Sequence, residues 1–169
     1  MQVQFYYLPS LTFRPMNNEL HNDVKNLIAG FDTVLMATSG ADGEPEISYS
    51  PYAIVEAQLY VFLSDLAMHT GNLKANPRAS LLFIENEQDA EKLHARKRVT
   101  FRATAQLIDR NSDQFRSAMT AMEARFGEIM PLLESLPDFH LFAMRTDSAT
   151  LVRGFADAHT IECDGFPQS

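Results

Sequence analysis

Apolar residues recur along this chain at two spacings, one typical of strands and one typical of helices. Strict alternation or short apolar runs predict strands at residues 33–38, 46–54, 59–63, 79–84, 98–108, 139–144 and 149–161. Apolar positions three and four apart predict helices from Asn17 or Asn18 to Gly30, at 67–75, at 86–93, from Asn111 or Ser112 to Gly127, and at 128–135. Strands and helices therefore interleave along the chain.

The connections between the predicted strands favour an antiparallel arrangement. Asp42-Gly43, between two strands, is a strong hairpin signal. The strands are linked by hairpins rather than by full crossover helices, which argues against a doubly wound parallel sheet. We therefore predict an α+β, mainly β fold: an antiparallel barrel with peripheral helices. Residues 79–84 are apolar enough to be buried on both faces, and one face of the strand at 98–108 would carry Val99, Phe101, Ala103, Ala105 and Leu107.

Composition narrows the class of protein. The chain has 169 residues, 46% hydrophobic and 21% charged, which indicates one soluble domain, assigned to residues 17–169 behind an N-terminal arm at 1–16. The net charge of −8 counts against nucleic-acid binding through a broad basic face. The chain lacks an apolar run of about 18 residues and a basic signal region, so we expect no membrane segment and a cytoplasmic location. The single cysteine, Cys163, agrees with that compartment.

The sequence lacks the motifs of dinucleotide binding, phosphate-binding loops, zinc sites and serine hydrolases, so a bound cofactor is the expected source of any difficult chemistry. Two segments stand out. Residues 64–77 bring Ser64, His69 and Thr70 to the start of a short helix, where free amides favour an anion. Residues 94–100 hold Arg96 and Arg98 on one face of a strand, a candidate clamp for a phosphate or carboxylate. The alternatives are that Ser64 and Thr70 only cap the helix and that the arginines pair with the acidic stretch at 85–91.

At these two segments the sequence resembles the haem-utilisation (HugZ/HutZ-type) branch of the pyridoxamine 5′-phosphate oxidase-like split barrels. The residues that carry the resemblance are 46–52, 64–81, 95–101, 125–129, 138–142 and 153–158. The resemblance implies a six-stranded split barrel and a homodimer with a cofactor pocket at the interface, which holds FMN in the wider superfamily. It places the strand that holds Ser48, Tyr49, Ser50 and Pro51 along the flavin ring, Ser64 and the positions of Met68 and His69 at the phosphate end, and Arg98 beside the flavin. Thr70 and Arg96, from the two segments above, complete the predicted cofactor site.

The resemblance leaves three functions open. The first is a dimeric FMN-binding protein, with FMN-dependent oxidoreductase activity as the expected chemistry. The alternative is a haem-binding or haem-degrading protein of iron acquisition. In that branch haem binds near the dimer cleft, an acidic residue matching Asp138 lies nearby, and a histidine in a C-terminal extension ligates the iron. Here no histidine follows His159. The second alternative is a non-catalytic dimeric binding module. Catalytic residues are not assigned, and no metal site is expected.

Overall fold

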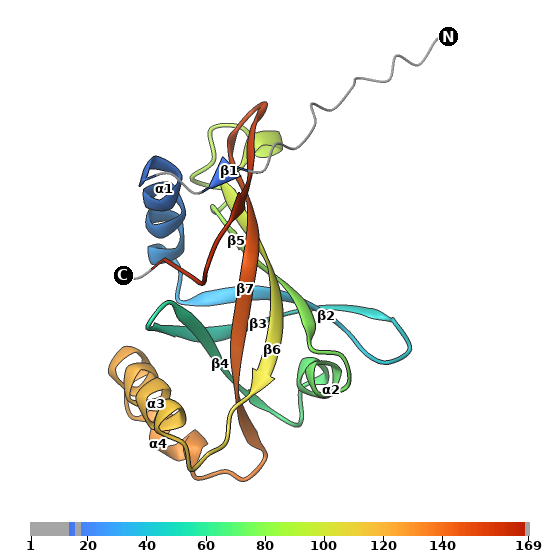
Figure 1. Cartoon of the computed structure of the whole chain (residues 1–169), viewed down its shortest axis with the longest axis vertical. Helices are drawn as coiled ribbons and strands as arrows, with labels where there is room; N and C mark the ends of the chain where they lie inside the picture. The colour runs from blue at the N-terminus through green and yellow to red at the C-terminus, as the bar shows by residue number, and fades with distance from the viewer. Residues whose placement is uncertain (1–13, 16–17, 168–169) are drawn as a thin grey trace.

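The computed structural model describes residues 14–15 and 18–167 (Figure 1). Eight strands are β1 (Arg14–Pro15), β2 (Thr33–Ser39), β3 (Pro45–Val55), β4 (Gln58–Ser64), β5 (Arg78–Ile84), β6 (Arg98–Leu107), β7 (Phe139–Gly154) and β8 (Asp157–Glu162). Four α-helices are α1 (Asn18–Ala29), α2 (Met68–Ala75), α3 (Asp113–Phe126) and α4 (Ile129–Glu134), with a short 3₁₀ turn, η1, at Leu93–Ala95.

Six antiparallel strands close into a barrel in the order β7-β4-β3-β2-β5-β6, and β6 returns to β7 to complete it. The long strand β7 decides the shape. Its first part pairs with β4 and its last part with β8, while β6 pairs along most of its length. The predicted six-stranded antiparallel barrel with peripheral helices is confirmed. Strand β8 lies outside the ring, and β1 pairs with it in parallel. The predicted arm at 1–16 lies, apart from Arg14–Pro15, outside the described residues.

Two local predictions are wrong. Residues 86–93 are not a helix but turns that lead into η1. The Glu85 amide donates to the Lys97 carbonyl oxygen at 2.9 Å, so this segment must reverse within a hairpin. The strands predicted at 139–144 and 149–161 divide differently: β7 runs unbroken to Gly154, and the chain reverses at Phe155 and Ala156. The polar stretch within β7 suggested a loop, but a bulge absorbs one residue there and the pairing with β6 continues.

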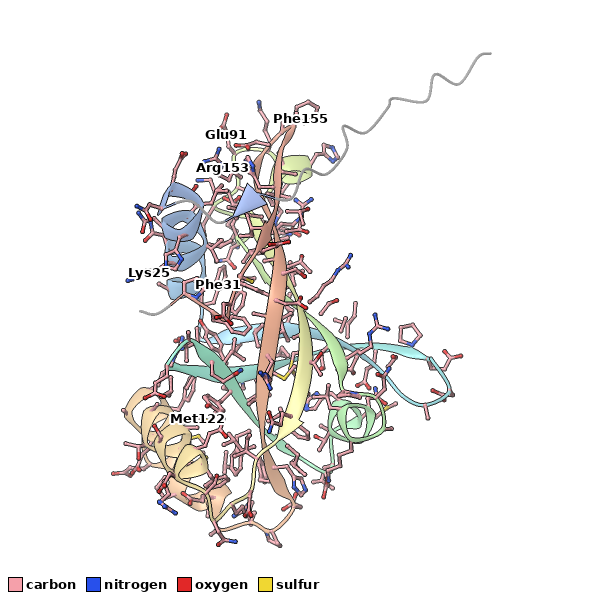
Figure 2. The ribbon with its side chains drawn as sticks, viewed as in Figure 1. Lys25, Phe31, Glu91, Met122, Arg153 and Phe155 are labelled. Carbon is pink, nitrogen blue, oxygen red and sulfur yellow. The ribbon has the colours of Figure 1, made fainter. Side chains whose placement is uncertain are left out.

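Two apolar clusters hold the helices on the barrel. One fills the barrel and includes Leu20, Val24 and Ile28 of α1. The other lies between the outside of β4 and β7 and helices α3 and α4, and Met122 of α3 points into it (Figure 2). Helix α2 lies beside the β2–β3 hairpin (Figure 1), and its Leu73 also belongs to the cluster that fills the barrel. Ser112 caps α3 as predicted, accepting a hydrogen bond from the Phe115 amide.

The outer face of the barrel differs from the sequence prediction at two places. Residues 79–84 were expected to be buried on both faces, yet Leu82 and Ile84 are only half-buried on the outside of β5. Leu107, expected on the buried face of β6, is exposed at the strand's end. Leu82 and Ile84 face outward where no helix of the described residues covers β5, and Leu107 has the inward parity but lies at the last position of β6. Among the described residues, every helix falls short of the length and apolarity that crossing a membrane requires.

Candidate functional site

Strand β3 carries four of the predicted site residues, and the strand pleat points them to opposite faces. Tyr49 and Pro51 are exposed on the outside of the barrel. Ser48 and Ser50 lie on the other face, where Ser50 is buried and its hydroxyl donates to the Pro51 carbonyl oxygen at 2.8 Å. These four residues therefore serve two separate surfaces, and a single flat ligand on one face of the strand contacts only two of their side chains.

His69 in the first turn of α2 lies against Ser48. Its Nδ1 is 2.9 Å from Ser48 Oγ, and the residue is 8% exposed. Burial lowers the pKa of His69, and the nearby Glu46 carboxylate only partly opposes that effect. The ring is therefore neutral near pH 7. The structure brings His69 and Ser48 together as a hydrogen-bonded pair, without supplying a cation there.

The Ser64 and Thr70 hydroxyls make local hydrogen bonds and do not cap α2. The Ser64 hydroxyl donates to Asp138 Oδ2 at 2.7 Å and accepts from the Leu66 amide. The buried Thr70 hydroxyl donates to the Ser64 carbonyl oxygen at 2.6 Å. The capping alternative is wrong, because the cap position is Ala67 and makes no side-chain hydrogen bond. Both hydroxyls already have protein partners.

Three charged or titratable residues beside Ser64 were missed by the sequence analysis as a group. Lys74 Nζ lies 2.5 Å from Asp65 Oδ1, and His140 Nε2 lies 2.8 Å from Asp65 Oδ2 and 3.1 Å from Lys74 Nζ. Lys74 and then His140 lower the pKa of Asp65. The pairing of β4 with β7 brings these residues together across 75 positions of sequence. No short-range pattern signals such a contact.

The two predicted arginines lie at the other end of the molecule. Arg96 directs its guanidinium to the Glu85 carbonyl oxygen and to the Glu87 carboxylate, and Arg98 donates to the Arg96 carbonyl oxygen at 3.0 Å. The alternative that arginines pair with the acidic stretch at 85–91 is confirmed for Arg96. Arg98 keeps part of its guanidinium unbonded among the described residues.

Within one chain, the predicted site residues therefore form two groups. The segment that follows α2 meets β6 where the Ala105 amide donates to the Pro77 carbonyl oxygen at 2.7 Å. Arg98 begins the same strand seven residues earlier, roughly 23 Å away at about 3.3 Å per residue. One chain does not bring Arg96 and Arg98 to Ser64 and His69.

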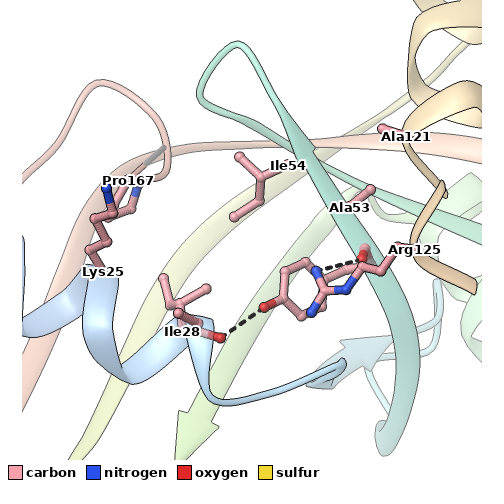
Figure 3. A pocket seen from close by; sticks show the side chains of 9 residues that line it. Lys25, Ile28, Ala53, Ile54, Ala121, Arg125 and Pro167 are labelled. Atoms are coloured by element: carbon pink, nitrogen blue, oxygen red, sulfur yellow. Dashed lines mark hydrogen bonds between the residues drawn. The ribbon is translucent and has the colours of Figure 1, made fainter. Parts of the chain in front are cut away.

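A small pocket of about 180 Å³ lies between α1, β3 and α3 (Figure 3). Arg125 stacks on the Tyr52 ring, 4.4 Å from its centroid, and donates to the Tyr52 carbonyl oxygen. The Tyr52 hydroxyl bonds to the carbonyl oxygens of Ile28 and Phe31. These polar groups satisfy one another, so the pocket fastens α1 and α3 to β3. Within residues 14–15 and 18–167, no cluster of three or more histidine, cysteine or acidic side chains is placed to hold a metal ion.

Comparison with known proteins gives a family and several relatives. The family described as Pyridoxamine 5′-phosphate oxidase matches residues 20–153. The chain is 35% identical over 149 residues to the Vibrio cholerae serotype O1 protein named Heme oxygenase HutZ, a match that covers 88% of this chain and 85% of that protein.

Solved structures agree with this match. A crystal structure described as HutZ, the heme storage protein from Vibrio cholerae, has a TM-score of 0.74 and 35% identity, covering 79% of this chain and 94% of the other. Campylobacter jejuni ChuZ has a TM-score of 0.79 and 25% identity, covering 92% of this chain and 65% of the other. A heme binding protein from Mycobacterium smegmatis, at 21% identity and a TM-score of 0.74, shares the fold.

Proposed function

This chain belongs to the haem-utilisation branch of the pyridoxamine 5′-phosphate oxidase-like split barrels, and we propose that it binds haem in a cleft between two copies of itself. The observation that carries the proposal is the 35% identity over 88% of the chain to a protein named as a heme oxygenase. The same relative is also described as a heme storage protein. Haem is the ligand common to both descriptions, so binding is the function we propose, and turnover of bound haem is a question for the assay.

Haem replaces FMN as the favoured ligand because the region around the start of α2 offers a phosphate few free cations or hydrogen-bond donors. A phosphate site needs cations or free donors. His69 has a lowered pKa, Lys74 is bonded to Asp65, and the Thr70 hydroxyl is already donated. The carboxylates of Asp65 and Asp138 add negative charge at the same end. These contacts oppose a second anion there.

The outer face of the barrel suits a flat apolar ligand better. Strand pairing sets Tyr49, Leu35 and Leu82 in one row across β3, β2 and β5. Ile47 is 80% exposed and Tyr49 is 66% exposed on this face. A porphyrin ring is mostly apolar, and covering such side chains removes apolar surface from water. This face is the surface on which we place the haem ring.

The same exposed row supports the dimer. Contiguous exposed apolar residues on a sheet face mark an interaction surface, and a second copy supplies a cover of matching size. We therefore propose that two copies join through the outer face of β2, β3 and β5.

Cys163 does not account for iron binding. Haem iron takes a thiolate, imidazole, thioether or phenolate as axial ligand. The Cys163 side chain is buried, and burial raises the pKa of its thiol, so the thiolate is scarce at neutral pH. A lone reduced cysteine agrees with a cytoplasmic location, which we keep as part of the proposal.

The proposal is tested by titrating the full chain with haemin and, separately, with FMN. Wild type should give a Soret band that saturates with haemin and should leave FMN fluorescence unquenched at low micromolar concentration. Loss of the Soret band over time on adding a reductant and oxygen would show degradation, and its persistence would show storage. Light scattering should give the mass of a dimer.

A matched pair of variants locates the surface. Ile47→Glu puts a charge on the apolar row, whereas Leu132→Glu makes the same change at a 58% exposed leucine on α4. Ile47→Glu should weaken the dimer and the Soret band together, and Leu132→Glu should change neither. FMN quenching without a Soret band would identify a flavoprotein instead. A dimer that gives neither signal would identify a non-catalytic binding module, and in both cases the haem proposal fails.

A further inference from the structure

Three arginines on the outside of β5, β6 and β7 are brought together by strand pairing. Arg78 pairs with Thr104, and Thr104 pairs with Arg145 on its other side. Arg102 lies two residues from Thr104 on the same face of β6. At strand spacings of 4.7–4.9 Å, the backbones of Arg78 and Arg145 are roughly 10 Å apart, and Arg102 is roughly 7 Å along from the line between them. Three extended guanidinium groups can therefore meet one ligand.

These three side chains lack the partners that the other arginines have. Arg96, Arg116, Arg125 and Arg153 each bond to a carboxylate. Over residues 14–15 and 18–167, the side chains of Arg78, Arg102 and Arg145 make neither a hydrogen bond nor an ion pair. Unpaired like charges on neighbouring strands repel one another. The protein has a net charge of −8, yet none of its many carboxylates among the described residues pairs with these three arginines. An anion that bridges them would remove that repulsion.

The three arginines line a surface hollow of about 1930 Å³. Arg102 is flanked by Ser80 and Ser148 in the strand register, and these short side chains leave room above the sheet. Four carboxylates also line the hollow, from Glu56, Asp147, Glu162 and Asp164, and Asp147 lies in the bulge of β7 opposite Arg102 and Ala103. Arg78, Arg102 and Arg145 are the cations of this lining, so an acidic group of a ligand would bind beside them.

Apolar surface adjoins the arginines on the same outer face. Leu82 lies on β5 one strand from β6, in the row next to Arg102, and Leu35 follows on β2. The sheet thus presents guanidinium groups beside the apolar row that ends at Tyr49. A flat apolar body with two acidic groups on one edge matches this order of surfaces.

We propose that Arg78, Arg102 and Arg145 form a binding site for a ligand with two carboxylate or phosphate groups, which are the two propionates of haem if the function proposed above holds. The planar fork of arginine binds either group through paired hydrogen bonds. The inference deepens the proposed function by assigning residues to the acidic edge of the ligand, and it rests on that function only for the ligand's name.

The test compares the full chain with a triple variant, Arg78→Gln, Arg102→Gln and Arg145→Gln. A control variant loses the same three charges elsewhere, through Lys92→Gln, Lys97→Gln and Arg116→Gln at exposed side chains. Each protein is titrated with haemin and with haemin dimethyl ester, in which both propionates are neutral. Wild type and the control should bind haemin about tenfold or more tighter than the ester. The triple variant should lose this discrimination.

The outcomes separate the two proposals. If wild type binds haemin and the triple variant still discriminates haemin from its ester, the arginine site is wrong while haem binding stands. If wild type binds no haemin, the proposed function fails, and inorganic pyrophosphate then decides the site by calorimetry: binding that the triple variant loses supports it, and absence of binding overturns it. A lower mass of the triple variant in light scattering would show that the arginines bind a second copy, which also overturns the ligand site.

Discussion

The Tyr52 hydroxyl gives a sharp test of how α1 is fastened to the barrel. It is buried, 3.0 Å from the Ile28 carbonyl oxygen and 2.9 Å from that of Phe31, at the end of α1. Tyr52→Phe removes this hydroxyl and keeps the ring, which packs edge-on against Phe83 with centroids 5.3 Å apart. The variant therefore isolates the hydrogen bonds from the packing.

The expected cost follows from the partners that remain. One buried neutral hydrogen bond contributes about 1 kcal/mol, and an acceptor left without a partner costs more. Both carbonyl oxygens keep another donor, because the Phe31 amide bonds to Ile28 and Arg125 bonds to Phe31. Tyr52→Phe should therefore lower the free energy of unfolding by about 1–2 kcal/mol and the melting temperature by roughly 2–8 °C for a chain of this size.

Urea unfolding at fixed protein concentration measures this loss, with Tyr49→Phe as the matched control on the same strand. Tyr49→Phe keeps the ring, and the Tyr49 hydroxyl has no hydrogen-bond partner among the described residues, so this variant should stay within about 0.5 kcal/mol of wild type. Burial also raises the pKa of Tyr52, so the last step of an ultraviolet titration should vanish in Tyr52→Phe only. Equal losses in the two variants, or no loss at Tyr52, would refute the argument.

Two further predictions concern His69 and the glycines. Burial lowers the pKa of His69, so as pH falls below about 6.5 the unfolded state takes up a proton before the folded state does. The free energy of unfolding therefore decreases until the pH passes the folded-state pKa. His69→Gln should remove this part of the pH dependence in urea unfolding, and an unchanged dependence of the free energy of unfolding on pH would contradict the argument. Gly165 has φ +97°, and a Cβ there would lie 2.5 Å from the Ala57 carbonyl oxygen. Gly165→Ala should therefore lower the free energy of unfolding by about 1–3 kcal/mol. Gly71 in α2 has open space around it, so Gly71→Ala should raise the free energy of unfolding by about 0.5–1 kcal/mol in the same assay. If both variants shift the free energy in the same direction, backbone conformation is not the cause.

The sequence by itself determined most elements of this fold. The Asp42-Gly43 turn lies between β2 and β3 as predicted, with Gly43 at φ 81°, and Ser112 caps α3. Alternation also assigned Val99, Phe101, Ala103 and Ala105 to the buried face of β6. Such features depend on turn chemistry and on which face a side chain occupies, and a few neighbouring residues encode both.

Only the tertiary structure decided which residues share a surface. The contact of Asp65 with His140, the row formed by Arg78, Thr104 and Arg145, and the unbroken run of β7 all come from pairing between strands that are distant in sequence. The same pairing separates Arg98 from His69, although both were predicted to meet one anion. Local patterns set the face of each strand, but closure of the barrel by β6 and β7 sets its neighbours, and that choice depends on the whole chain.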